Sequence, residues 1–344
     1  DQTESAAETS DAAGKEEAAT DADPQASSDL NIPADADAAA GTGTDDEAAL
    51  AGTESPASGG TQSSNYSNNK KYVYDQWSSP VKSYLYDNGD GTLTRVEYTG
   101  SKIIHEIFNS QYQLVSSASF SPELSLFGGF YHGSDANYIV EGQNNTDQSD
   151  TREVVRVIKY SFDWQEKGSC SLYGANTYIP FDAGSLRFAE SGDYLMIRTC
   201  HTMYGTDVHH QANLSMEVNT SSMKVMDSFS MVWNIANGYV SHSFNQFVQT
   251  DGNQLITVDH GDSYPRALVL CRYDNTIGSS ELVSGTCSSV NAIEFLGKDG
   301  DNYTGATVGG FEVSGSSYLI AGTNANKASS ISSSDKDHTQ NVFV

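Results

Sequence analysis

Basic residues are scarce in this sequence, because 18 Lys plus Arg stand against 45 Asp plus Glu among 344 residues, a formal net charge of -27. A chain this acidic is repelled by phosphate backbones, which argues against nucleic-acid binding through a basic face. No run of about 18 apolar residues occurs either, so the sequence predicts no membrane-spanning helix. Four cysteines and three tryptophans are too few for a small disulfide-dense scaffold.

Aromatic residues are missing from the N-terminal part of the chain. Residues 1–65 hold 15 acids, one base (Lys15), 17 alanines and no Phe, Tyr or Trp, whereas the rest of the chain holds 30 acids, 17 bases and every aromatic residue. Low hydrophobicity with charge of one sign cannot bury enough apolar surface to offset chain entropy. The sequence therefore predicts a disordered acidic tether over residues 1–68 and a folded domain over residues 69–344.

The folded part is expected to be all-β. From Tyr72 onward, short runs of β-branched and aromatic residues alternate with Gly, Asn, Asp and Ser clusters, as strands and turns do. Four phenylalanines, here called the Phe anchors, each precede a second apolar run and recur at nearly equal intervals of 58, 59 and 64: Phe130, Phe188, Phe247 and Phe311. A second set recurs at intervals of 62, 58 and 55, namely Val96–Tyr98, Val157–Tyr160, Met216–Val218 and Cys271–Tyr273. We expect the anchors to pack in the core.

Two coincident registers with a period of about 60 residues indicate a repeat, and each unit has turn signals for four strands. The pattern resembles the irregular, long-bladed β-propellers of secreted bacterial proteins. That resemblance implies four-stranded blades, about four of them plus the start of another within residues 69–344. Thr339–Val344 is interpreted as the first strand of a further unit, so we expect a propeller truncated at its C-terminus, with more blades to follow.

The tether also bears on location. The chain begins at Asp1 rather than Met, and an acidic Ala/Ser/Thr-rich leader resembles the spacer behind the lipidated cysteine of bacterial surface lipoproteins. The resemblance implies an extracellular or cell-surface protein, held to a membrane only through a removed N-terminal lipid anchor. An ordinary interdomain linker remains the alternative. We expect a monomer.

The cysteines show no C-x-x-C spacing, so the sequence does not indicate a structural zinc site. Cys271 and Cys287 flank a predicted hairpin, where a cross-strand disulfide is feasible, and Cys170 and Cys200 fall within one unit and could pair as well. Four buried thiols are the alternative, and either state is compatible with export.

Five of the eight histidines lie in three loop-like segments, where propellers commonly place their chemistry because loops are not committed to sheet hydrogen bonds. The segments are 200–211, 238–247 and 258–266. Candidate ligand-binding residues are His201, Asp207, His209, His210, His242, Asn245, Gln246, Asp259, His260 and Asp262. The first and third segments follow the returning strand of successive units, so we expect them to be neighbours on one face.

Imidazole and carboxylate groups together can hold a divalent metal ion, the one cofactor for which the sequence offers candidates, with Asp207, Asp259 or Asp262 as oxygen donors. The metal candidates are His201, His209, His242, Gln246 and His260. An ion held by His and Gln inside a propeller is similar to the site of oligogalacturonate lyases, although no run in this chain reproduces the lyase motifs in order. Metal-free elimination is a further possibility, with His242, His260 or Tyr264 as the base and Arg266 neutralising a substrate carboxylate.

Structural capping is the alternative for all these groups, since His and Asp residues after a strand often bond to neighbouring backbone. No phosphate loop, nucleophile elbow or His-Glu-x-x-His helix occurs. The favoured hypothesis is a cell-surface propeller that binds a glycan or a surface protein, for which 19 Tyr supply flat faces with polar tips. The alternative is a carbohydrate-active enzyme, similar to a polysaccharide lyase, that uses the His-rich face.

Overall fold

The computed structural model describes residues 78–182, 184–204, 209–230, 243–261, 267–273, 277–278, 287–295, 306–325 and 340–344. The predicted tether lies outside the described residues. Within them the protein is all-β, as predicted. No helix in this part of the chain has the length and apolar character needed to cross a membrane.

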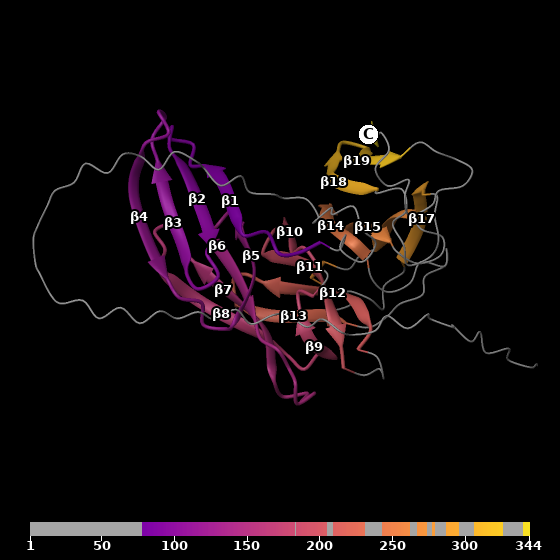
Figure 1. Ribbon diagram of the computed structural model, residues 1–344, viewed down its shortest axis with the longest axis horizontal. Coiled ribbons are helices and arrows are strands. Elements are labelled where there is room, and N and C mark those ends of the chain that lie inside the picture. Colours follow the sequence, from indigo (N-terminus) through magenta and orange to yellow (C-terminus); the bar gives the residue numbers. More distant parts are fainter. Residues whose placement is uncertain are drawn as a thin grey trace, which may run out of the picture. The chain divides into compact units, whose positions relative to one another are not determined.

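The strands form five antiparallel sheets, numbered here in chain order (Figure 1). Sheet 1 contains β1 (Ser83–Asp87), β2 (Leu93–Tyr98), β3 (Ile103–Phe108) and β4 (Leu114–Phe120). Sheet 2 contains β5 (Leu126–His132), β6 (Asn137–Gly142), β7 (Glu153–Tyr160) and β8 (Glu166–Tyr173). Sheet 3 contains β9 (Thr177–Pro180), β10 (Arg187–Ser191), β11 (Tyr194–Met203), β12 (Gln211–Asn219) and β13 (Lys224–Phe229). Sheet 4 contains β14 (Ser243–Asp251), β15 (Gln254–Gly261), β16 (Ala267–Tyr273) and β17 (Cys287–Glu294), and sheet 5 contains β18 (Thr307–Ser314), β19 (Ser317–Ala325) and β20 (Gln340–Phe343).

The sheets are blades of a β-propeller, because in each one consecutive strands pair in order; the short β9 joins sheet 3 beside β11. The prediction for the last strand was wrong. Gln340–Phe343 does not begin a new unit but pairs antiparallel with β19, so it is the third strand of sheet 5. Its alternation of polar and apolar residues suits any strand of a blade, which is why the sequence alone misplaced it.

The Phe anchors lie in β5, β10, β14 and β18, the first strands of the paired series in four sheets, with β9 left out of the count in sheet 3. Each stands opposite an aliphatic residue of the next strand: Ile139, Ile197, Val258 and Ile320. Their packing in the core is confirmed, with one difference of phase. Phe130, Phe188 and Phe311 contact the cluster shared with the preceding sheet, whereas Phe247 contacts the cluster shared with sheet 5, which follows. A one-residue shift turns a strand side chain to the opposite face, so the repeat-equivalent residue in sheet 4 is Val248.

The second register holds for three of its four members. Val157–Tyr160, Met216–Val218 and Cys271–Tyr273 lie in the third strands β7, β12 and β16. Val96–Tyr98 lies instead in β2, the second strand of sheet 1. The predicted equivalence is therefore off by one strand in sheet 1, because neighbouring strands of a blade have similar composition.

Three first hairpins share the same two-residue turn. Gly192, Gly252 and Gly315 have φ angles of 56°, 60° and 59°, and each begins the turn between the first and second strand of its sheet. Positive φ at this position lets the turn match the twist of the flanking strands, which glycine adopts without strain. The turn chemistry thus reinforces the repeat.

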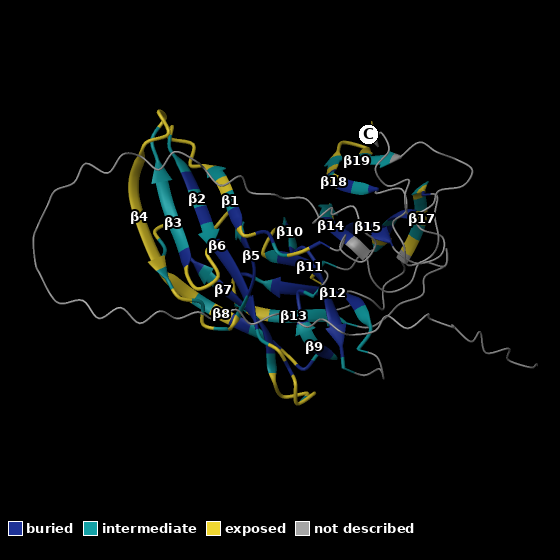
Figure 2. Ribbon diagram, viewed as in Figure 1, coloured by how far each residue is buried: buried dark blue, intermediate teal, exposed yellow. Residues whose placement is uncertain are grey.

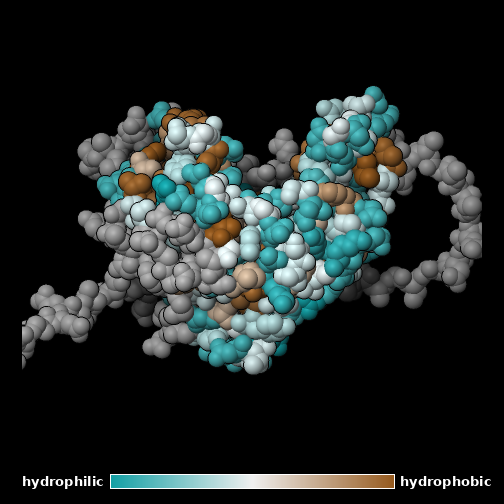
Figure 3. Space-filling view, turned by 180° about the vertical axis from the view of Figure 1, so that it is seen from behind, coloured by the Kyte–Doolittle hydropathy of each residue, from teal (hydrophilic) through white to brown (hydrophobic). Residues whose placement is uncertain are grey.

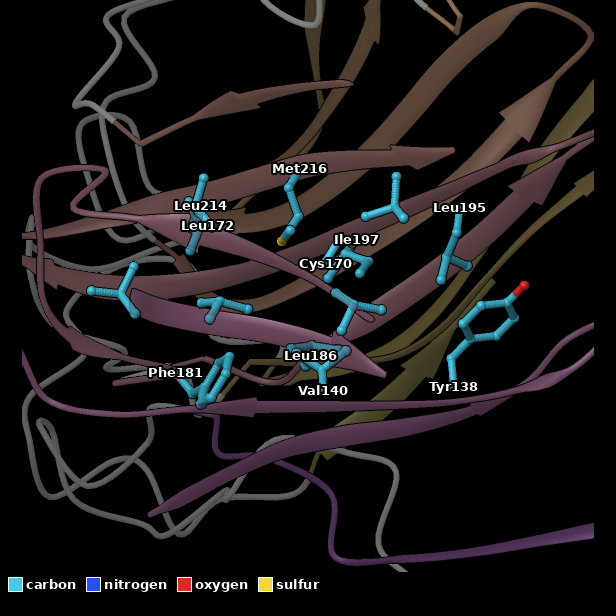
Figure 4. Close-up of a cluster of buried hydrophobic side chains, with 14 of the residues drawn as sticks. Tyr138, Val140, Cys170, Leu172, Phe181, Leu186, Leu195, Ile197, Leu214 and Met216 are labelled. Carbon is cyan, nitrogen blue, oxygen red and sulfur yellow. The ribbon is translucent and has the colours of Figure 1, made fainter. Parts of the chain in front are cut away.

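Burial decreases from the middle strands of a sheet to its outermost strand (Figure 2). Every residue of β6 is buried, while β4 is almost wholly exposed. The largest core cluster lies between sheets 2 and 3, where Val140 and Leu172 face Ile197 and Met216 (Figure 4). Neighbouring sheets pack face to face, and each contributes alternate residues to the core between them. This packing positions the loops at the ends of the strands.

The disulfide that the sequence allowed between Cys170 and Cys200 is not formed. Cys170 is a buried free thiol, and the Sγ atom of Cys200 donates to the Ala212 carbonyl at 2.9 Å. Cys271 is buried in β16, and Cys287 stands opposite Tyr273 in the register of β16 and β17. The side chain of Cys287 lies outside the described residues.

Candidate functional site

Four of the sequence-predicted polar residues meet on the first two strands of sheet 4. Asn245 pairs in register with His260, and Gln246 pairs with Asp259. All four side chains are buried. A buried polar group is stable only when its hydrogen bonds are satisfied, so the partners of these groups decide what the cluster can do.

Asp259 forms a buried ion pair with an arginine of the neighbouring sheet. Its carboxylate accepts from Nε of Arg198 at 3.1 Å and from Nη2 at 2.5 Å, while Nη1 of Arg198 donates to Oγ of Ser215 at 2.7 Å. The bidentate geometry is the strong form of this interaction. Asp259 therefore joins sheet 4 to sheet 3.

Asn245 connects three sheets. Its Oδ1 accepts from the hydroxyl of Ser185, next to sheet 3, at 2.7 Å, and its Nδ2 donates to the Val308 carbonyl of sheet 5 at 2.9 Å. Arg187 adds a bond from Nε to the Gln246 carbonyl at 3.1 Å, and its guanidinium lies 4.4 Å from the centre of the Phe247 ring. Burial lowers the pKa of Arg187 to about 10, which leaves it a cation at neutral pH.

Three of the candidate histidines, His201, His209 and His260, have partners in or beside their own sheet. Nδ1 of His201 lies 2.8 Å from Oγ1 of Thr177 in β9. His209 stacks on Tyr178 with ring centres 4.1 Å apart. His260 meets the Phe295 ring edge-on at 5.2 Å. These contacts are those of packed and capping side chains.

The metal candidates do not gather into one described cluster. Among the described residues, no group of three or more His, Cys, Asp or Glu could hold a metal ion. His210 is half-buried and its carbonyl accepts from the Met203 amide at 2.8 Å. The remaining candidates lie outside the described residues: Asp207, His242, Asp262, Tyr264 and Arg266.

The polar bonds between sheets span one repeat. The partners Arg198–Asp259, Ser185–Asn245 and Arg187–Gln246 are 61, 60 and 59 positions apart. The same holds for Glu190 with Thr250 and for Lys159 with Thr220, at 60 and 61 positions. The polar cluster therefore holds successive blades together. Arg187, Arg198 and Ser185 were not predicted from the sequence, although each lies one repeat before a predicted site residue.

His201 makes the stability of the fold depend on pH. Burial lowers its pKa from 6.5 to about 4, against a smaller opposing effect of the Ser230 backbone. Because the unfolded chain binds the proton more readily, its stabilising effect is present at pH 7 and is lost as the pH falls from 6.5 toward 4. We expect His201→Asn to reduce the loss of unfolding free energy between pH 7 and pH 4.5 by roughly 2 kcal/mol. Urea unfolding of both proteins at the two pH values measures this; equal losses would contradict it.

An aromatic ladder, defined as Tyr86, His132 and Phe162, was not found from the sequence. The rings of Tyr86 and His132 are stacked at 3.8 Å with an interplanar angle of 12°, and the ring of Phe162 lies 5.1 Å beyond His132. Nδ1 of His132 lies 2.8 Å from Oδ1 of Asn137, which fixes its ring. The ladder starts in β1 of sheet 1 and ends in the β7–β8 turn of sheet 2, where Phe162 is 51% exposed. No sequence signal links these residues, because three different segments contribute one ring each.

No known protein family and no curated protein matches this chain. Solved structures that resemble it include the hemagglutinin-neuraminidase of parainfluenza virus 5, with 10% identity, a TM-score of 0.40 and coverage of 72% of this chain and 71% of that one. The Dos1 propeller has 11% identity, a TM-score of 0.40 and coverage of 71% and 54%. The arabinanase Arb43A of Bacillus subtilis has 10% identity, a TM-score of 0.36 and coverage of 77% and 92%. The chain spans 56% of an ACO/RPE65 chimera that it also resembles.

Proposed function

We propose that the protein is an extracellular or cell-surface binding module, a propeller that recognises a glycan and is displayed on a flexible acidic tether. The aromatic ladder carries the proposal. Its outer ring is exposed, its inner rings are held in place by stacking, and flat rings with nearby polar groups suit the apolar faces and hydroxyls of sugars. A surface protein is the other ligand class for which the Tyr-rich composition is suited.

Polar groups stand close to the ladder. Asp163 follows Phe162 in the same turn, and Asp87 follows Tyr86 at the end of β1. Asn137 is buried and holds the ring of His132, so it positions the ladder and does not itself face a ligand. Carboxylate oxygens accept hydrogen bonds from sugar hydroxyls. The negative charge of the carboxylates favours a neutral or cationic glycan over an acidic one.

Glycan binding by the full chain tests the proposal. We expect retention of at least one neutral or amino-sugar glycan on an array. Phe162→Ala should raise the dissociation constant about fivefold, because one aromatic contact contributes about 1 kcal/mol. Isothermal titration of both proteins measures the change.

Tyr112→Ala is the matched control, since Tyr112 is 76% exposed in the β3–β4 turn of the neighbouring sheet and lies outside the ladder. It should leave the dissociation constant unchanged. An equal effect of both variants, or no retention of any glycan, would contradict the proposal. Release of unsaturated uronates from an acidic glycan, sensitive to a chelator, would favour the lyase alternative instead.

A further inference from the structure

His132 stands in the middle of the aromatic ladder, where two rings fix its orientation. The Tyr86 ring stacks on the imidazole at 3.8 Å, and the Phe162 ring lies 5.1 Å from it. His132 itself is part-exposed. An imidazole held in this way makes a hydrogen bond of fixed direction and loses little freedom when it meets a ligand.

The side chain of Asn137 determines which ring nitrogen of His132 carries the hydrogen. Nδ1 of His132 lies 2.8 Å from Oδ1 of Asn137, and Asn137 is buried. An amide oxygen can only accept, so Nδ1 donates, and a neutral imidazole then has its lone pair on Nε2. At neutral pH, Nε2 of His132 is therefore a hydrogen-bond acceptor.

Solvent reaches this acceptor. Within the described part of the chain the one polar partner of His132 is Asn137, at Nδ1, and Nε2 is neither bonded nor buried. The Nε2 atoms of His201 and His260 are buried, by contrast. Those two imidazoles lack an acceptor that a ligand could reach. His132 therefore offers what they do not, an oriented acceptor at the surface.

The exposed polar groups next to the ladder share this character. Asp87 and Asp163 follow Tyr86 and Phe162 in the sequence and carry carboxylates. Carboxylates and an unprotonated imidazole nitrogen accept hydrogen bonds and do not donate them. The face of sheets 1 and 2 at the right of Figure 3 is mainly hydrophilic, with hydrophobic residues in small separate patches, which suits a polar ligand. A ligand of the ladder must therefore supply donors.

We propose that Nε2 of His132 accepts a hydrogen bond from a hydroxyl of the bound sugar and so determines specificity at the ladder. The inference rests on the proposed glycan binding and adds what the site selects: a neutral sugar with a free hydroxyl beside the face that lies on Phe162. A methyl ether at that position has no hydrogen to donate. A carboxylate presents lone pairs to a lone pair, and the neighbouring aspartates repel its charge.

Acid should release the sugar. Protonation places a hydrogen on Nε2 and turns the acceptor into a donor. Carboxylates and ammonium groups ordinarily keep their charge between pH 5.5 and 7.5, whereas an imidazole changes its charge there. The elements packed against the ring and its turn carry only groups of the first two kinds besides the imidazole, among the described residues: Asp87, Asp135, Lys159, Asp163 and Glu190.

Two measurements on the full chain test the free acceptor without any glycan. Diethyl pyrocarbonate acylates an unprotonated imidazole nitrogen that solvent reaches, so peptide mass spectrometry should find His132 modified about tenfold faster than His201. Long-range proton–nitrogen NMR, assigned with His132→Phe, should show hydrogen on Nδ1 and none on Nε2. Equal modification of the two histidines, or hydrogen on Nε2, overturns the proposal.

Glycan binding tests the contact itself. The probe is the neutral glycan that the array retains most strongly, titrated into each protein by calorimetry. His132→Phe keeps a ring in the ladder but removes the acceptor, so it should raise the dissociation constant about fivefold at pH 7.5. His105→Phe is the matched control, because His105 stacks on Trp164 at 4.4 Å outside the ladder, and it should leave the dissociation constant unchanged.

The pH profile distinguishes this role from a structural one. Between pH 7.5 and 5.5 the dissociation constant of the original chain should rise about fivefold, while that of His132→Phe should stay constant. Parallel profiles of the two proteins overturn the proposal, and so does equal retention of the per-O-methylated glycan. If Phe162→Ala weakens binding and His132→Phe does not, the glycan site stands and this inference fails; if no glycan is retained, both fail.

Discussion

Asp259→Ala is expected to lower the free energy of unfolding by about 3 to 5 kcal/mol. The substitution removes the partner of the Arg198 guanidinium, which is 6% exposed and keeps its charge in the space between sheets 3 and 4. An unpaired buried cation costs more than the ion pair contributed, so the loss exceeds that of an ordinary hydrogen bond. Equilibrium unfolding in urea measures it.

Replacing both partners tests whether the loss comes from the unpaired buried charge or from the changed shape of the interface. In Arg198→Met with Asp259→Leu no charge remains buried at this pair, so most of the lost stability should return. Arg156→Met is the control, because Arg156 pairs with Glu153 at 2.7 Å on a part-exposed surface and should cost about 1 kcal/mol or less. A double variant as unstable as Asp259→Ala would show that shape, and not charge, governs this interface.

Tyr138→Ala is expected to cost about 3 to 5 kcal/mol, because it empties the volume of a fully buried aromatic ring in β6. Figure 4 shows this ring beside the aliphatic side chains between sheets 2 and 3, with its hydroxyl turned away from them. The hydroxyl donates to Oδ1 of Asp135 at 2.7 Å. Thermal and urea unfolding report the change.

Tyr138→Phe distinguishes the ring from its hydroxyl. It keeps the packing and loses one hydrogen bond, so it should cost about 1 kcal/mol. Tyr173→Ala, at a 57% exposed position in β8, should change stability by less than about 0.5 kcal/mol. A large loss in Tyr138→Phe would mean that the bond to Asp135, and not the ring, stabilises the core.

The sequence predicted the fold class because turn chemistry and strand periodicity repeat with every blade. Phe130, Phe188 and Phe311 fell where they were expected, since apolar alternation is visible along the chain. Phe247 was out of phase, because a repeat this long tolerates a shift by a single position, and such a shift reverses the face of a strand. The strand Gln340–Phe343 was misassigned for a related reason, as nothing local tells a third strand from a first.

The site was harder to predict than the fold. Asn245 and Asp259 were selected as ligand-binding candidates, and the structure gives them partners in neighbouring sheets. Their arginine and serine partners lie one repeat away, and pairing across sheets is a property of tertiary structure that composition and spacing do not encode. The ladder of Tyr86, His132 and Phe162 depends likewise on three segments meeting in space.

The repeat-length separation of the inter-sheet bonds has a consequence for how the chain folds. Arg198 can reach Asp259, and Ser185 can reach Asn245, as soon as about one more unit of chain is available. No described bond of this kind requires the two ends of the propeller to meet. The entropy cost of closing the loop is therefore similar for each added blade. Blades can add in order while the chain emerges from the ribosome, and each completed sheet serves as the template for the next one.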